Sequence, residues 1–217
     1  MVYNVISTGS KGNAVIINNN ILIDCGVPFK ALEGHHKNLQ LVLLTHIHID
    51  HFKANTVRKL AKERPTLRWG VPRWLLQKVL DADVDKRNID VMEMHKNYNY
   101  GILSTTPFPL VHDVPNCGYK IYTPQGKVFY ATDTNTLESV EAKGYDLYMV
   151  EANYGEKEIV ERIRAKEDEG LHCYEWKVLK NHLSKEKADD FLYANMESHS
   201  QYVYLHQHTE KATQSWY

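Results

Sequence analysis

Short apolar runs separated by polar turns recur along the chain and predict an alternation of strands and helices. Runs of apolar and β-branched residues predict strands at 2–7, 14–17, 21–24, 41–45, 67–71, 102–110, 118–123, 127–131, 147–151 and 202–205. Apolar residues at helical spacing predict helices at 52–63, 72–80, 156–169, 173–179 and 185–198, with Ser184 as N-cap of the last. The string GSKGN at 9–13 lacks phosphate-loop spacing and is expected to form a tight hairpin turn. The pattern accommodates two sheets faced by outer helices.

Composition narrows the class of protein. The chain has 217 residues, of which 43% are hydrophobic, so we expect one domain over 1–217. The net charge of −1, from 26 basic and 27 acidic residues, gives no indication of a large basic surface for binding nucleic acid. Cys25, Cys117 and Cys173 are scattered without a CxxC pair, which argues against a disulfide framework or zinc ribbon and favours a reducing cytoplasm. We expect no signal peptide and no membrane association, since no apolar run approaches about 18 residues.

The string THIHIDH is the densest concentration of metal-capable side chains in the sequence. It supplies four of them, His46, His48, Asp50 and His51, in six consecutive positions. The string follows the apolar run at 41–44, which reads as a buried strand. Residues two apart on an extended backbone point the same way, so His46 and His48 can converge on one ion. If the chain then turns, Asp50 and His51 can face a second ion. This spacing favours a two-metal site over a packing role.

The motif HxHxDH after an apolar strand resembles the metallo-β-lactamase superfamily, and the likeness continues along the chain. TPFPLVHDVPNCGYKI carries His112, GKVFYATDTN carries Asp133, and QYVYLHQHTE carries His206 and His208. ISTGSKGNAVIINNNILIDCG is similar to the superfamily's opening hairpin, whose final Asp, here Asp24, braces the metal loop from behind. The resemblance implies an α/β fold, an αββα sandwich of two mixed β-sheets flanked by helices.

The same resemblance implies a set of metal ligands. One ion is held by His46, His48 and His112, a second by Asp50, His51 and His206, and Asp133 bridges the two. His206 and His208 compete for the last position because they lie two apart; we prefer His206, which directly follows the run VYL. The expected cofactors are two divalent ions, zinc first and manganese as the alternative. Two such ions about 3.5–4 Å apart can activate a water molecule and stabilise the attacking and leaving oxygens.

Two further strings resemble the phosphodiesterase branch of the superfamily, which includes ribonuclease Z and small bacterial nuclease-like proteins. They are LYMVEANYG, with Glu151, and KNHLSKEKADDFL, with His182, although Asn181 replaces the usual Gly. By resemblance His182 protonates the leaving oxygen and Glu151 fixes its tautomer, so the predicted catalytic residues are Asp50, His182 and Glu151. The competing interpretations are a strand-end carboxylate and a loop or helix-capping histidine.

The sequence therefore predicts a dimetal phosphodiesterase that hydrolyses a cyclic nucleotide or another small nucleotide phosphodiester. Phage-encoded proteins of this branch destroy cyclic nucleotides that signal bacterial immunity, and the balanced charge favours such a substrate over a polymer. The first alternative is a single-stranded DNA or RNA nuclease, and the second is a lactonase or thioesterase-type hydrolase, which is not expected to need Glu151 and His182. A non-catalytic binding protein is a further option, disfavoured by the complete ligand set. Homodimers are usual in this branch, so we expect one here.

Overall fold

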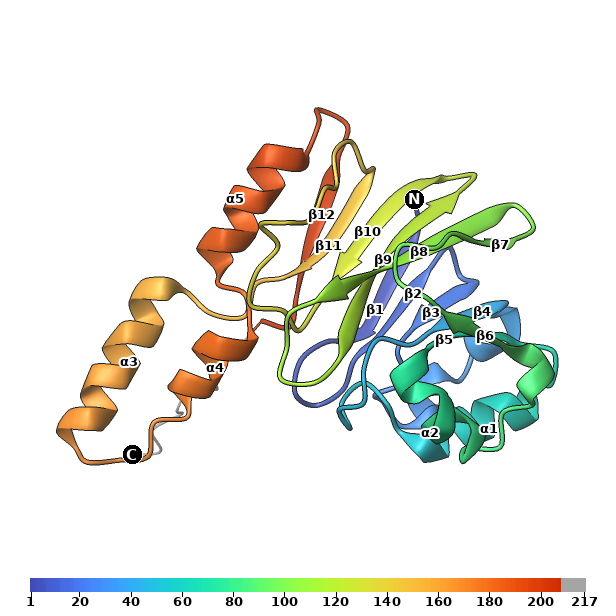
Figure 1. Cartoon of the computed structure of the whole chain (residues 1–217), viewed down its shortest axis with the longest axis horizontal. Coiled ribbons are helices and arrows are strands. Elements are labelled where there is room, and N and C mark those ends of the chain that lie inside the picture. Colours follow the sequence, from blue (N-terminus) through green and yellow to red (C-terminus); the bar gives the residue numbers. More distant parts are fainter. Residues whose placement is uncertain (208–217) are drawn as a thin grey trace.

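Two six-stranded sheets form the centre of the molecule in the computed structural model, which describes residues 1–207 (Figure 1). The first sheet has the strand order β1 (Tyr3–Ser7), β2 (Ala14–Ile17), β3 (Ile21–Ile23), β4 (Leu41–Leu43), β5 (Arg68–Pro72) and β6 (Ile89–Met92). The second has the order β12 (Gln201–Leu205), β11 (Leu147–Glu151), β10 (Gly126–Ala131), β9 (Asn116–Thr123), β8 (Leu103–Leu110) and β7 (Tyr98–Tyr100). Each sheet combines parallel and antiparallel pairs, so both are mixed.

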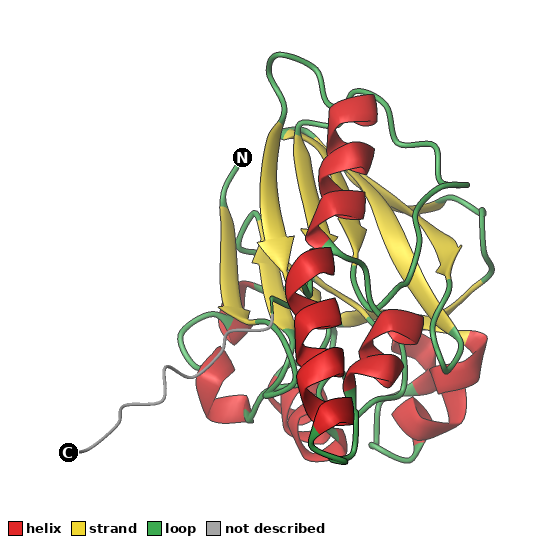
Figure 2. Ribbon diagram, turned by 90° about the vertical axis from the view of Figure 1, so that its left-hand side faces the viewer, coloured by secondary structure: helices red, strands yellow, loops and turns green. Residues whose placement is uncertain are grey.

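Helices cover the outer faces of both sheets. Helices α1 (Ala54–Glu63) and α2 (Leu76–Leu80) pack against the first sheet, and α5 (Lys185–Asn195) packs against the second. In the side view of Figure 2, α5 stands in front of the second sheet, and α3 (Glu156–Asp168) lies below it. α3 pairs with α4 (Glu175–Asn181) at one end of the molecule. Short 3-10 turns occupy Phe29–Leu32, His36–Asn38, Arg73–Leu75 and Lys86–Asn88. The predicted αββα sandwich is confirmed.

The apolar run at 41–44 is continuous because β4 is buried on both faces. Leu41 and Leu43 point into the core between the two sheets, whereas Val42 and Leu44 point into the core beneath α1 and α2. This alternation is the two-residue period of a strand, and a central strand covered on both sides has no polar face to offer. Burial on both sides holds the end of β4 rigidly, and the THIHIDH string begins there.

Several predicted boundaries shift in the structure, and two strands were missed. Strand β4 ends at Leu43 and α1 begins at Ala54, so the residues between them form a long irregular loop. The missed strands β6 and β7 carry polar residues and lie at sheet edges, where only one neighbour constrains the sequence. The predicted N-cap is confirmed, since Ser184 Oγ accepts from the Lys187 backbone N–H at 3.1 Å. No helix within residues 1–207 has both the length and the apolar character needed to cross a membrane.

Candidate metal centre

The predicted site residues come together at one edge of the sandwich because several strands end there. Strands β10, β11 and β12 run parallel, so Asp133, Glu151 and His206 emerge side by side at their carboxyl ends. The loop after β4 brings the THIHIDH residues to the same edge. The loop after β8 adds His112, and the end of α4 adds His182.

Three imidazoles converge at the first candidate ion position. His46, His48 and His112 each offer a ring nitrogen, and these atoms lie within 4.8 Å of one another. The His112 Nε2 is 3.3 Å from His48 Nδ1. The His46 Nε2 is buried and has no hydrogen-bond partner in the described part of the chain. Desolvation, aided by the charge of His51, lowers the pKa of His46 well below its usual value, which keeps this ring neutral with a lone pair available. A buried, unpartnered acceptor among imidazoles fits a metal ligand.

Asp133 lies between the histidines of the second candidate position. Its Oδ2 is 2.9 Å from His51 Nε2, and its Oδ1 is 3.1 Å from His206 Nδ1. Asp133 also groups with His46 and His51 within 4.8 Å, so it borders both candidate positions. Asp50 lies at the margin, with Oδ2 3.8 Å from His51 Nε2. The structure brings all seven predicted ligands to one place, His206 among them; the choice of His206 over His208 stays a prediction, because His208 falls outside the described residues.

Asp24 braces the metal loop as expected. The carboxylate is fully buried and accepts from the Thr45 backbone N–H at 2.9 Å, the Thr45 hydroxyl at 2.8 Å and His51 Nδ1 at 2.7 Å. This last bond fixes the ring and directs Nε2 of His51 toward Asp133, the usual relation between a ligating histidine and its outer carboxylate. Gly26 lets the loop pack closely, since a Cβ there would lie 1.6 Å from the Asp50 carbonyl oxygen.

The electrostatics around Asp133 favour positive charge on His51 and His206, in contrast to His46, whose pKa is lowered. Although desolvation opposes it, the carboxylates of Asp133 and Asp24 raise the pKa of His51 to about 10. Desolvation likewise lowers the pKa of His206, but the carboxylates of Asp133 and Glu151 outweigh it and raise this pKa well above its usual value. For Asp133, burial is outweighed by His51 and His206, and its pKa falls well below the usual range. A centre that stabilises extra protons on buried rings also stabilises a cation in their place, so the donor set fits divalent metal ions.

Glu151 and His182 form a closely held pair beside this centre. Glu151 is fully buried, and its Oε1 accepts from His182 Nδ1 at 2.6 Å and lies 3.1 Å from His206 Nδ1. Its Oε2 accepts from the backbone N–H groups of Thr134 at 2.9 Å and Leu183 at 3.3 Å. The strand-end interpretation of Glu151 is thus correct for one oxygen, while the other oxygen orients His182. His182 itself lines the cleft, and within residues 1–207 no hydrogen bond engages its second ring nitrogen, Nε2.

Several residues that contact the predicted ligands or line the cleft were not identified from the sequence, among them Asn13, Asp113, Tyr174 and Lys177. The Asn13 Nδ2 lies 2.7 Å from His51 Nε2, and its Oδ1 accepts from the Gly9 backbone N–H. The Asp113 Oδ1 lies 3.2 Å from His112 Nε2. The cleft has a volume of 280 Å³, and Tyr174 and Lys177 line it from the α4 region. Asp113 directly follows a predicted ligand and Asn13 ends the GSKGN turn, so both had a local signal; Tyr174 and Lys177 had none.

Comparisons with known proteins agree with the fold. Residues 19–183 match the family model described as the beta-lactamase superfamily domain. Human tRNase Z, short form, is similar in structure at 14% identity, with a TM-score of 0.71 over 95% of this chain and 92% of that one. Zinc-bound PqqB from Methylobacterium extorquens is 12% identical, with a TM-score of 0.69 over 95% of this chain and 89% of that one. A diphosphatase from the PhnP family is 13% identical, with a TM-score of 0.64 over 94% of this chain and 85% of that one. No curated protein matches the chain.

Proposed function

We propose, from the premise that the chain belongs to the beta-lactamase superfamily, that it is a metal-dependent phosphodiester hydrolase. The family and the donor set support a metal-dependent hydrolase, and the similar structures include a tRNase Z and a diphosphatase. The observation that carries the finer proposal is the Glu151–His182 pair, held at 2.6 Å beside Asp133. Hydrolysis of a phosphodiester expels an alkoxide, which needs a proton. His182, oriented by Glu151, would donate that proton to the leaving oxygen.

The roles of the individual residues follow from their contacts. When bound, divalent ions would supply an activated water and neutralise charge on the phosphate. His46, His48 and His112 would hold one ion, and Asp50, His51 and His206 the other, with Asp133 shared. His182, whose Nδ1 donates to Glu151, presents Nε2 to the cleft and would hold the proton for the leaving oxygen. The buried negative charge of Glu151 stabilises the imidazolium before that transfer.

A small nucleotide phosphodiester suits the dimensions of the cleft. The cleft volume of 280 Å³ lies just below the range of small-ligand sites, roughly 300–1,000 Å³, so the cleft fits a small substrate. Tyr174, which is 57% exposed, gives the cleft wall an aromatic face on which a base can stack. Lys177 lies on the same wall with its Nζ 3.6 Å from Asp113 Oδ2, a weak pairing that a phosphate can replace. We therefore keep the cyclic nucleotide or similar small diester as the proposed substrate, hydrolysed with zinc or manganese by a cytoplasmic homodimer.

A substrate panel tests the proposal. Purified protein is supplied with zinc or with manganese and offered bis(p-nitrophenyl) phosphate, a cyclic mononucleotide, a single-stranded oligonucleotide and a lactone. We expect turnover of the phosphodiesters and none of the lactone. Lactone hydrolysis without phosphodiester hydrolysis would reject the proposal in favour of an acyl hydrolase. Strong preference for the oligonucleotide, with activity collapsing as salt rises, would replace the small substrate by a polymer.

A further inference from the structure

A second cavity adjoins the metal cleft and shares a wall with it. This cavity has a volume of 760 Å³ and is lined by residues of the metal loop, the turn before α1 and the α1 and α2 helices. Ile49 lines both the cleft and this cavity, and its side chain is 76% exposed. Ile47, the other isoleucine of the loop, lines only the second cavity. The HIHID string therefore lies between the metal cleft, which His48 and Asp50 line, and the second cavity, which Ile47 lines. A molecule longer than the cleft can extend over Ile49 into the second cavity.

The walls of this cavity are apolar and aromatic. Phe29 and Phe52 are nearly buried and form part of its lining together with the two isoleucines. The Lys59 Nζ lies 4.4 Å from the centroid of the Phe29 ring and so covers that ring face, whereas Ile47 and Ile49 are 37% and 76% exposed. An exposed apolar surface of this kind beside a polar reaction centre is typical of a ligand-binding groove. A flat, weakly polar group such as a nucleobase fits these walls.

The charges around the cavity are all of one sign. Lys53, Lys59 and Lys78 line it, and no carboxylate does. Within residues 1–207 none of these lysines forms an ion pair. Three uncompensated lysines on one cavity contrast with the chain's balance of 26 basic and 27 acidic residues. The cavity therefore favours an anion, and its apolar walls favour an anion that carries an apolar group.

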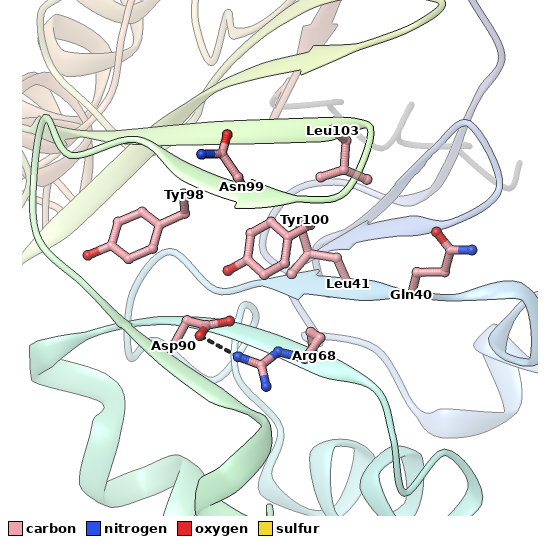
Figure 3. Close-up of a pocket in the computed structure, with 8 residues that line it drawn as sticks. All are labelled: Gln40, Leu41, Arg68, Asp90, Tyr98, Asn99, Tyr100 and Leu103. Atoms are coloured by element: carbon pink, nitrogen blue, oxygen red, sulfur yellow. Dashed lines mark hydrogen bonds and ion pairs between the residues drawn. The ribbon is translucent and has the colours of Figure 1, made fainter.

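A third cavity provides a comparison within the same molecule. It has a volume of 420 Å³ and lies at the amino-terminal ends of β4 and β5, away from the metal loop (Figure 3). Its one cation, Arg68, is paired with Asp90, and Tyr98 and Tyr100 lie on the opposite wall (Figure 3). Because its charges are already compensated, this cavity offers no anion site. The lysine-lined cavity is different in this respect.

We infer that the lysine-lined cavity binds a second nucleotide unit of the substrate, whose scissile phosphate lies in the metal cleft. The base of this unit packs on Ile47, Ile49 and Phe52, and its phosphate lies near Lys59 and Lys78. The inference rests on the proposed function and deepens it: the substrate class becomes a dinucleotide phosphodiester, linear or cyclic. The cavity is large enough for one nucleotide, and Ile49 is the ridge that the connecting sugar crosses.

The test is a charge reversal at the two exposed helix lysines, Lys59→Glu with Lys78→Glu. The matched control is Lys37→Glu with Lys62→Glu, since both of these lysines are exposed and line neither cavity. The probe is a 5′-phosphorylated dithymidylate with a phosphorothioate link that resists hydrolysis, and its Kd is measured by titration calorimetry. We expect the Kd to rise about tenfold in the test variant, as removal and reversal of two near-surface charges imply, and to stay unchanged in the control. Turnover of bis(p-nitrophenyl) phosphate should be equal in both variants.

The outcomes separate this inference from the proposed function. Equal Kd values for wild type and Lys59→Glu/Lys78→Glu overturn the inference, even if bis(p-nitrophenyl) phosphate is hydrolysed. A raised Kd in a protein that hydrolyses no phosphodiester supports the nucleotide pocket and rejects the proposed reaction. Sedimentation of both variants adds a further check. If the wild type is a dimer that only the test variant dissociates, with an unchanged Kd, the cavity is an interface between two copies and the inference fails.

Discussion

Removal of the His182 imidazole should slow the reaction by an amount that depends on the leaving group. In His182→Ala the ring that Glu151 holds at 2.6 Å disappears, while the predicted metal ligands keep their side chains. A positioned general acid contributes about 10²–10⁴ in rate, or about 3–5 kcal/mol in the barrier. A sugar alkoxide is a poor leaving group and needs that proton, whereas p-nitrophenoxide leaves without much assistance. We expect kcat to fall by two to four orders of magnitude, as that range implies, for a dinucleotide and far less for bis(p-nitrophenyl) phosphate.

The assay compares kcat for both substrates in His182→Ala, Glu151→Gln and the double variant, with metal content determined for each. Because Glu151 acts through His182, the double variant should be no slower than His182→Ala alone. Glu151 also lies 3.1 Å from His206 Nδ1, so Glu151→Gln is interpreted only at equal metal content. Equal losses on the two substrates, or losses that add in the double variant, would refute the role of His182 as the acid held by Glu151.

Three further predictions follow from the contacts of single residues. Asp133→Ala should lose most of both metal ions by elemental analysis, since the carboxylate borders both positions; an unchanged metal count contradicts the bridge. Gly26→Ala should lower the melting temperature, because its Cβ would lie 1.6 Å from the Asp50 carbonyl oxygen, an overlap that costs about 1–3 kcal/mol or more; equal melting curves count against the close packing. Of the three thiols, only Cys173 should react with a disulfide reagent at pH 8 in the folded protein, because the other two are buried and desolvation raises their pKa; three reactive thiols without denaturant would contradict this.

Local density in the sequence was enough to locate the metal loop, and the family resemblance supplied the rest of the ligand set. Four metal-capable side chains within six positions have no packing explanation, so the loop could be assigned from the residues alone. Asp133 and His206 are each single residues after ordinary strands, and only the parallel pairing of β10, β11 and β12 brings them to the same edge. No local pattern encodes that pairing. The assignment of these two residues as ligands therefore depended on the resemblance. The structure places His206 Nδ1 3.1 Å from Asp133 Oδ1, and their role as ligands stays a prediction.

The residues that escaped prediction are those whose direction depends on tertiary contacts. Asn13 belongs to a turn that the sequence predicts, yet its amide reaches His51 only because Asp50 and Gly9 hold the turn against the metal loop. Tyr174 lines the cleft because the segment after α3 folds back toward the sheet edge. Strand and helix periods assign a residue to a face, but they do not specify where a loop side chain points.

The backbone at the site explains why residues of one chemical type occur there. All seven non-glycine residues with positive φ in the described chain are Asn, Asp or His, and three of them, Asp24, Asp133 and His206, are site residues with φ of 62°, 57° and 51°. These types enter the left-handed region most readily, at a cost of order 1–3 kcal/mol when the conformation is strained. Hydrogen bonds fix the turns: the Asn116 amide donates to the Asp133 carbonyl at 2.7 Å, and the Thr8 hydroxyl accepts from the His206 backbone N–H at 2.7 Å. At Asp133 and His206 one position therefore supplies both a predicted metal ligand and a residue type that readily adopts the left-handed turn at the end of its strand.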